Sequence, residues 1–144
     1  MFEACRQKQE EVKKLFAAAA TPEEKYQLLM DLGRRQVSLS PEEKTEQSRV
    51  RGCQSITYLK ATLENGKSYF HIESDALISA GLGQILTMVY SGQAPEVVLK
   101  CPPTYLEELG LYASLSPGRA NGLASMFTKM KQEALKHIMA MTQG

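Results

Sequence analysis

Residues 56–74, ITYLKATLENGKSYFHIES, decide the fold, because they read as two strands joined by a tight turn. Asn65-Gly66 is a residue pair that accepts the positive φ angles of a two-residue type I′ hairpin turn. With these residues in the turn, Glu64 faces Lys67 and Leu59 faces Ile72. The hairpin then has an apolar face of Leu59, Ala61, Leu63, Phe70 and Ile72, and a polar face of Lys60, Thr62, Tyr69, His71 and Glu73.

Helical patterns flank this hairpin on both sides. Before it, apolar spacing predicts helices over 2–20 and 22–33, the second with Thr21 as its N-cap. After it, a helix from Ser74 as N-cap to about Ser91 is apolar almost all round, as expected if it covers the apolar face. Shorter helices over 95–99 and 103–109 and a long final helix from Ser116 follow. The sequence therefore predicts an α+β fold with a small antiparallel β-sheet flanked by helices.

Composition limits the classes of function. The 144 residues suit a single domain over 1–144. The 17 basic and 16 acidic residues provide no broad positive field, so we expect no nucleic-acid partner. The charged N-terminus resembles no secretory signal, and no stretch approaches the roughly 18 apolar residues of a membrane span. We therefore expect a cytoplasmic protein without a membrane partner.

The three cysteines, Cys5, Cys53 and Cys101, are widely spaced and form no CxxC motif. Such spacing fits neither a disulfide framework nor a metal site, so we expect free thiols and no metal. Cys5 lies on the apolar stripe of the first helix, and Cys101 precedes two prolines. We interpret both as small buried hydrophobic residues.

Cys53 has a different setting, at the joint between the long connection over 34–51 and the first strand. Gly52 gives the backbone freedom there, and Arg49 and Arg51 would favour the nucleophilic thiolate. Burial would instead raise the pKa of the thiol and disfavour the thiolate. A reactive and a structural role for Cys53 both stay open on this basis.

A Cys–His hydrolase would need a base beside Cys53. A strand extended back without a bulge puts Cys53 on the apolar face, whereas His71 lies on the polar face. His137 lies beside the apolar stripe of the last helix, which is typical of a surface or boundary residue rather than a catalytic one. A bulge or a helix contact would change the placement of either histidine. Thiol–sulfur exchange, which needs a thiolate and access but no oxyanion hole, suits this cysteine better.

Two segments, RGCQSITYLKATLENGKSYFHIESDALISAGLGQILTMVYSGQAP and LGLYASLSPGRANGLASM, resemble the SufE family of sulfur-acceptor proteins. These proteins are partners of cysteine desulfurases in iron–sulfur cluster assembly. The order of GCQS, a downstream SDA and a late LSPxRxxGL carries the resemblance, which extends from EEKYQLLMDLG to the final helix. It implies a SufE/IscU-like fold.

The resemblance implies a sulfur carrier and desulfurase activator rather than an enzyme. Cys53 matches the acceptor cysteine, which takes persulfide sulfur from a SufS-type desulfurase and passes it to a SufB-type scaffold. The pyridoxal phosphate belongs to the desulfurase, so this chain needs no cofactor. A CsdE-type acceptor that serves a different desulfurase is a closely similar possibility, and a thiol hydrolase is one from another class.

The resemblance also suggests site residues. Gly52, Gln54 and Ser55 match the acceptor loop, and Asp75 and Arg119 match residues implicated in desulfurase contact or loop control. From the residues alone, Asp75 and Arg119 would each be ordinary first-turn helix residues. We group Arg51 with them because of its position beside Cys53.

The chain departs from the family pattern at Tyr58, at Gly118, and in Cys5 and Cys101, which match no family position. Tyr58 stands where a tryptophan is usual, and Gly118 stands where a serine is common. We expect Gly118 to loosen the start of the last helix.

Two more classes of protein fit the sequence less well. A scaffold that assembles a cluster would need several converging cysteines, and a redox sensor would need a resolving cysteine near Cys53. The desulfurase partner, the burial of Cys53 and whether the chain forms a homodimer stay open.

Overall fold

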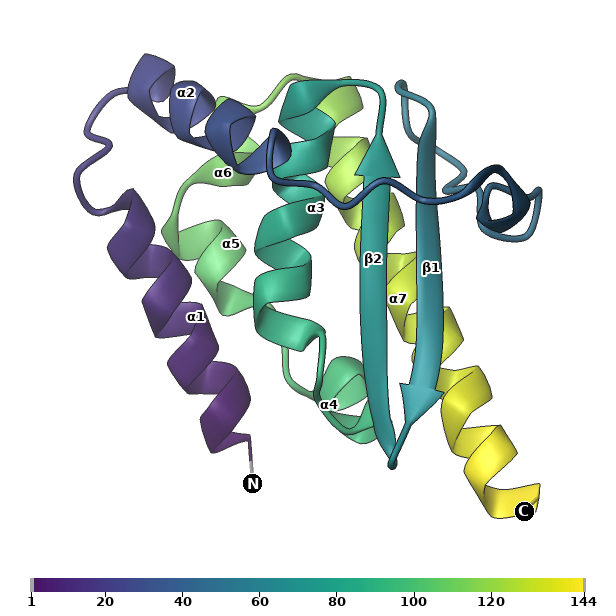
Figure 1. The fold of residues 1–144 in the computed structure, drawn as a ribbon. Coiled ribbons are helices and arrows are strands. Elements are labelled where there is room, and N and C mark those ends of the chain that lie inside the picture. The colour runs from purple at the N-terminus through teal and green to yellow at the C-terminus, as the bar shows by residue number, and fades with distance from the viewer. Residues whose placement is uncertain (1, 144) are drawn as a thin grey trace.

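The computed structural model describes residues 2–143 and has two antiparallel strands among helices, which confirms the α+β prediction (Figure 1). In chain order the elements are α1 (Glu3–Phe16), α2 (Pro22–Gly33), the 3-10 helix η1 (Pro41–Glu43), β1 (Thr57–Glu64), β2 (Lys67–Ser74), α3 (Leu77–Tyr90), α4 (Pro95–Lys100), α5 (Thr104–Glu108), α6 (Leu111–Ser114) and α7 (Pro117–Gln143).

The hairpin has the predicted register. Leu59 pairs with Ile72, and Glu64 pairs with Lys67 across the turn. Asn65 and Gly66 have φ values of 53° and 76°, as a type I′ turn requires. The turn residues therefore set which side chains face the core.

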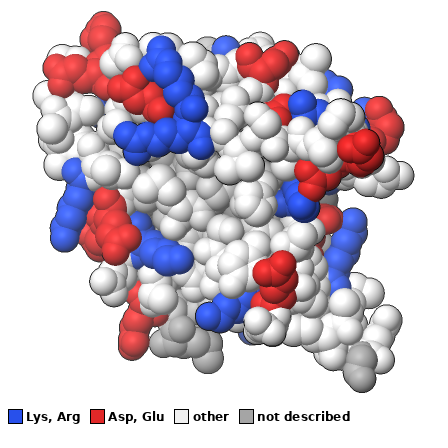
Figure 2. Space-filling view, viewed as in Figure 1, with Lys and Arg blue, Asp and Glu red and all other residues white. Residues whose placement is uncertain are grey.

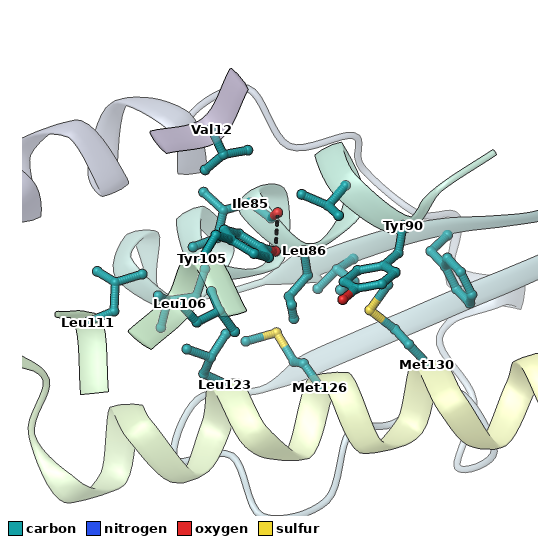
Figure 3. Packing of buried hydrophobic residues seen from close by; sticks show 14 of the residues in the cluster. Val12, Ile85, Leu86, Tyr90, Tyr105, Leu106, Leu111, Leu123, Met126 and Met130 are labelled. Carbon is teal, nitrogen blue, oxygen red and sulfur yellow. Dashed lines mark hydrogen bonds between the residues drawn. The ribbon is translucent and has the colours of Figure 1, made fainter. Parts of the chain in front are cut away.

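Helices α3 and α7 lie against one face of the hairpin, and α1 and α5 lie beyond α3 (Figure 1). The interior is formed mainly by apolar side chains of these helices, and the Tyr105 hydroxyl donates a 2.8 Å hydrogen bond to the Ile85 carbonyl (Figure 3). Leu59, Phe70 and Ile72 from the hairpin are 2–4% exposed. Helix α3 is central because nearly its whole surface is apolar.

The connection between α2 and β1 crosses the other face of the hairpin (Figure 1). The Leu39 amide donates to Glu73 Oε1 over 2.7 Å, Lys44 Nζ lies 2.6 Å from Glu73 Oε2, and Lys60 forms an ion pair with Glu43. The side chain of Glu73 is therefore only 18% exposed. The predicted polar face is partly covered by this strap, residues 34–51, rather than open to water.

The prediction that Ser74 caps α3 was wrong. Strand β2 continues to Ser74, and the N-cap of α3 is Ala76. The Ser74 hydroxyl instead donates to Ser55 Oγ over 3.0 Å and accepts from Thr57 Oγ1 over 2.9 Å. It also accepts a longer, 3.4 Å hydrogen bond from the amide of Ala76. Its shorter contacts are thus with residues of and beside β1, and they hold it in the sheet.

One further boundary and one further helix differ from expectation. Helix α1 ends at Phe16 rather than near Ala20, and the short helix α6 was not predicted. Gly110, with φ of 69°, separates α5 from α6, which explains why the two helical turns are not continuous.

Basic and acidic side chains are interspersed around a broad uncharged centre on the face seen in Figure 2. This face carries no field of a single sign. Among residues 2–143, no helix has the length and apolar character needed to cross a membrane.

Candidate functional site

Cys53 lies at the tip of a short loop that returns to the hairpin. The loop begins at Val50, whose amide donates to the Thr57 carbonyl over 2.8 Å, beside a matching 2.8 Å bond from the Leu59 amide to Ser48. Gly52 has φ of 85°, in the left-handed region that favours glycine. These contacts present Cys53, half-buried, outside the regular strand.

Asp75 closes the far side of this loop. Its Oδ1 accepts a 2.9 Å hydrogen bond from the Ile56 amide, and its own amide donates to the Ile56 carbonyl over 3.1 Å. Asp75 is therefore a clamp between the cysteine loop and the end of β2. Loop control and contact with a desulfurase both stay predictions for Asp75.

The Ser55 hydroxyl supports the loop from beneath. It lies 3.0 Å from the hydroxyls of Thr57 and Ser74, and all three residues are buried. It also donates a weak hydrogen bond to Cys53 Sγ at 3.8 Å. A network of hydroxyls thus connects the thiol to the base of both strands.

Helix α7 forms a seat for the loop because two of its residues lack side chains. A β-carbon at Gly122 would lie 2.9 Å from Cys53 Sγ, and one at Gly118 would lie 2.1 Å from the Gln54 amide carbon. The side chain of Gln54 therefore occupies the space beside Gly118. The expectation that Gly118 loosens the start of the helix did not include this contact. The sequence did not indicate that Gly118 and Gly122 contact the cysteine loop. Their four-residue spacing places both on one face of α7.

The arginines near Cys53 have other partners. Arg51 forms an exposed ion pair with Glu46, and Arg49 lies 5.8 Å from the centre of the Tyr58 ring. Arg119 donates a 2.8 Å hydrogen bond to Ser79 Oγ and so ties the start of α7 to α3. In the part of the chain that the structure describes, no hydrogen bond joins these guanidinium groups to Cys53.

Both histidines lie apart from Cys53. His137 Nδ1 is 2.7 Å from Ser68 Oγ, near the turn end of the hairpin, and burial lowers the pKa of His137. His71 pairs with Lys60 across the strands and is exposed. Since Cys53 adjoins the opposite end of the hairpin, neither imidazole is placed as the base that a Cys–His hydrolase requires.

The other two cysteines form a buried cluster at α1. Cys5 and Cys101 are 0% and 3% exposed, and Gln9 Nε2 lies 3.6 Å from each sulfur. Burial, followed by the contact with Cys5, raises the pKa of Cys101 to about 12. Within residues 2–143, no three His, Cys, Asp or Glu side chains converge as metal ligands.

The fold and site thus define a small α+β protein that presents one thiol on a clamped loop. The family model "SufE: Fe-S metabolism associated domain" matches residues 10–134, and the chain belongs to this SufE family.

Individual proteins agree with this assignment. The chain is 31% identical over 129 residues to an uncharacterized SufE-like protein of Synechocystis, covering 90% of this chain and 81% of the relative. It is 34% identical over 119 residues to the sulfur acceptor protein CsdE of Escherichia coli, covering 81% of each. A solution structure of a hypothetical protein from Thermus thermophilus has the same fold, with a TM-score of 0.74, 24% identity and coverage of 92% of this chain and 96% of that one.

Proposed function

We propose that this protein accepts sulfur on Cys53 from the persulfide of a cysteine desulfurase and stimulates that enzyme. The observation that carries the proposal is the position of Cys53, half-buried at the tip of a clamped loop with Ser55 as its hydrogen-bond donor. Membership of the SufE family and the likeness to a named sulfur acceptor support the same role.

The proposed step is a thiol–persulfide exchange. The Cys53 thiolate attacks the outer sulfur of the persulfide on the donor, and a new sulfur–sulfur bond forms. The donor's own sulfur–sulfur bond breaks, and its cysteine leaves as a thiolate. Because one sulfur–sulfur bond replaces another, the exchange needs no external oxidant or reductant, and it needs no histidine to act as a base.

The finer parts of the proposal follow the family resemblance. The donor is a SufS-type desulfurase that holds its own pyridoxal phosphate, the receiver is a SufB-type scaffold, and the location is the cytoplasm. The 34% identity to CsdE favours one second candidate, a CsdE-type acceptor that serves a different desulfurase.

Intact-mass spectrometry without reductant tests the proposal. The wild type and Cys53→Ser are incubated with L-cysteine and a SufS-type desulfurase, with Cys101→Ser as the control for a buried thiol. We expect the mass of one added sulfur atom in the wild type and in Cys101→Ser, and none in Cys53→Ser. An unmodified wild type, beside a desulfurase shown to be active, would count against the proposal.

A further inference from the structure

A polar groove of about 520 Å³ lies beside the cysteine loop. One wall is formed by Arg49, Arg51 and Gly52, which lead into Cys53. The other wall is one side of α7, and its residues are Asn121, Ala124, Ser125, Thr128, Lys129 and Gln132. Gly52 joins the two walls, because a β-carbon on it would lie 2.5 Å from Ser125 Oγ.

The charged residues that line the groove are all cations. Arg49, Arg51 and Lys129 are present, and among residues 2–143 the lining includes no carboxylate. The contacts that these three side chains already make are weak or leave hydrogen-bond donors unused. Arg51 shares an ion pair with Glu46 in which both side chains are more than 75% exposed, and such pairs contribute little stability.

The remaining two cations have little negative charge to balance them. Lys129 Nζ donates to the carbonyl oxygen of Gln47 over 2.6 Å and forms no ion pair with a carboxylate of the described residues. Arg49 Nε is buried and has no hydrogen-bond partner among the described residues. The groove therefore has a net positive charge, and its cationic side chains can bind carboxylates.

The shape of the groove suits a chain segment better than a small molecule. From Asn121 to Gln132 the wall follows α7 for roughly 16 Å at 1.5 Å per residue. An extended peptide rises about 3.3 Å per residue, so the groove has room for roughly five residues. Small-molecule sites are mostly apolar, whereas most of the residues that line this groove are of polar or charged types.

We infer that this groove binds an acidic segment of the desulfurase and thereby aligns the donor's persulfide with Cys53. The inference rests on the proposed function and names the chemistry by which the partner is recognised. Complementary charges across an interface raise the association rate and fix the register of the partner. A segment that follows α7 toward Gly52 would end beside the thiol that must be reached.

The test adds charge to the groove without removing any contact. Asn121 and Gln132 are exposed, and neither side chain makes a hydrogen bond within residues 2–143. Asn121→Asp with Gln132→Glu keeps the side-chain shapes and adds two negative charges, whereas Gln132→Lys adds a positive one. Gln7 on α1 is also exposed, so Gln7→Glu and Gln7→Lys are matched controls outside the groove.

The measurement is the initial rate of persulfide formation on Cys53 as the concentration of this protein is varied against a fixed SufS-type desulfurase. We expect the acidic pair to raise the half-saturating concentration by about tenfold, and Gln132→Lys to lower it. Both effects should shrink as ionic strength rises, because salt screens exposed charges. The two Gln7 variants should stay within about twofold of the wild type.

The outcomes separate the two proposals. If the wild type takes up sulfur and the groove variants saturate like the Gln7 controls, the groove inference is wrong and the proposed function stands. If a loss of similar size appears in the Gln7→Glu control, the effect is one of net charge and the groove inference is again wrong. A wild type that takes up no sulfur would overturn the proposed function, and the groove inference with it.

Discussion

Cys53 Sγ lies so close to Gly122 that a β-carbon at residue 122 would stand 2.9 Å from the sulfur. Gly122 is buried in the first half of α7, where its conformation is helical. The missing side chain, rather than unusual backbone geometry, is thus what allows the thiol to rest on the helix. The resting position of the sulfur depends on this contact.

The first prediction concerns Gly122→Ala in a double-mutant cycle with Cys53→Ala. Alanine favours a helix over glycine by up to about 1 kcal/mol, so Gly122→Ala should stabilise the Cys53→Ala protein. In the presence of the sulfur, crowding that costs about 1–3 kcal/mol should cancel or reverse this gain. Urea unfolding of the four proteins measures the coupling. Stability changes that add to within about 0.5 kcal/mol would show that the sulfur and residue 122 do not interact.

The second prediction concerns the clamp between Asp75 and Ile56. Asp75→Ala removes the acceptor of the Ile56 amide, and we expect a loss of about 1 kcal/mol because the site is exposed. Asp75→Asn keeps a side-chain oxygen in the same place and should retain most of the clamp. Amide hydrogen exchange at Ile56 is the measurement. Equal protection in wild type and Asp75→Ala would contradict the clamp.

The fold was largely predictable because its central signal is local. Asn65-Gly66 sets the turn, the turn sets the register, and the register sets which side chains need a helical cover. The N-cap of α3 was mispredicted because the hydroxyl of Ser74 has partners at Thr57 and Ser55, which are distant in sequence. Local capping rules do not include such contacts.

The candidate site was predictable only in part. The sequence indicated Cys53, Gly52 and Ser55 through their place in one short motif. The seat on α7 brings Gly118 and Gly122 against residues some 65 positions earlier in the chain, and no local pattern shows which loop fills those gaps. The groove beside Cys53 likewise combines residues of the strap with residues of α7.

The third prediction concerns selective alkylation of the thiols. Burial raises the pKa of Cys101 to about 12, so its thiolate should be under about one part in a thousand at pH 7.5. Cys5 is fully buried, whereas Cys53 is half-buried on a loop. Iodoacetamide at pH 7.5 should therefore label Cys53 in the native protein and all three thiols in urea. Peptide mass spectrometry would reveal any labelling of Cys101 that matches Cys53 in rate, which would exclude this packing.

The fourth prediction concerns the pH dependence of the strap. Burial opposes ionisation of Glu73, but Lys44 and the Leu39 amide outweigh it and lower the pKa of Glu73 below 4.5. Lys60, followed by the Ser40 amide, lowers the pKa of Glu43 to about 2. Because both pKa values are lower in the folded state, the stabilisation is complete above pH 4.5 and is lost as the pH falls below it.

The Leu39 amide reports this titration directly, since it donates to Glu73 Oε1. In an NMR titration of the wild type, its chemical shift should be constant from pH 7 to 5 and should change only below pH 4.5. In Glu73→Gln the low-pH change should disappear. Gln47→Glu, which adds a carboxylate at an exposed residue of the strap, serves as the control. A midpoint above 4.5 at Leu39 would mean that burial, rather than Lys44 and the amide, controls Glu73.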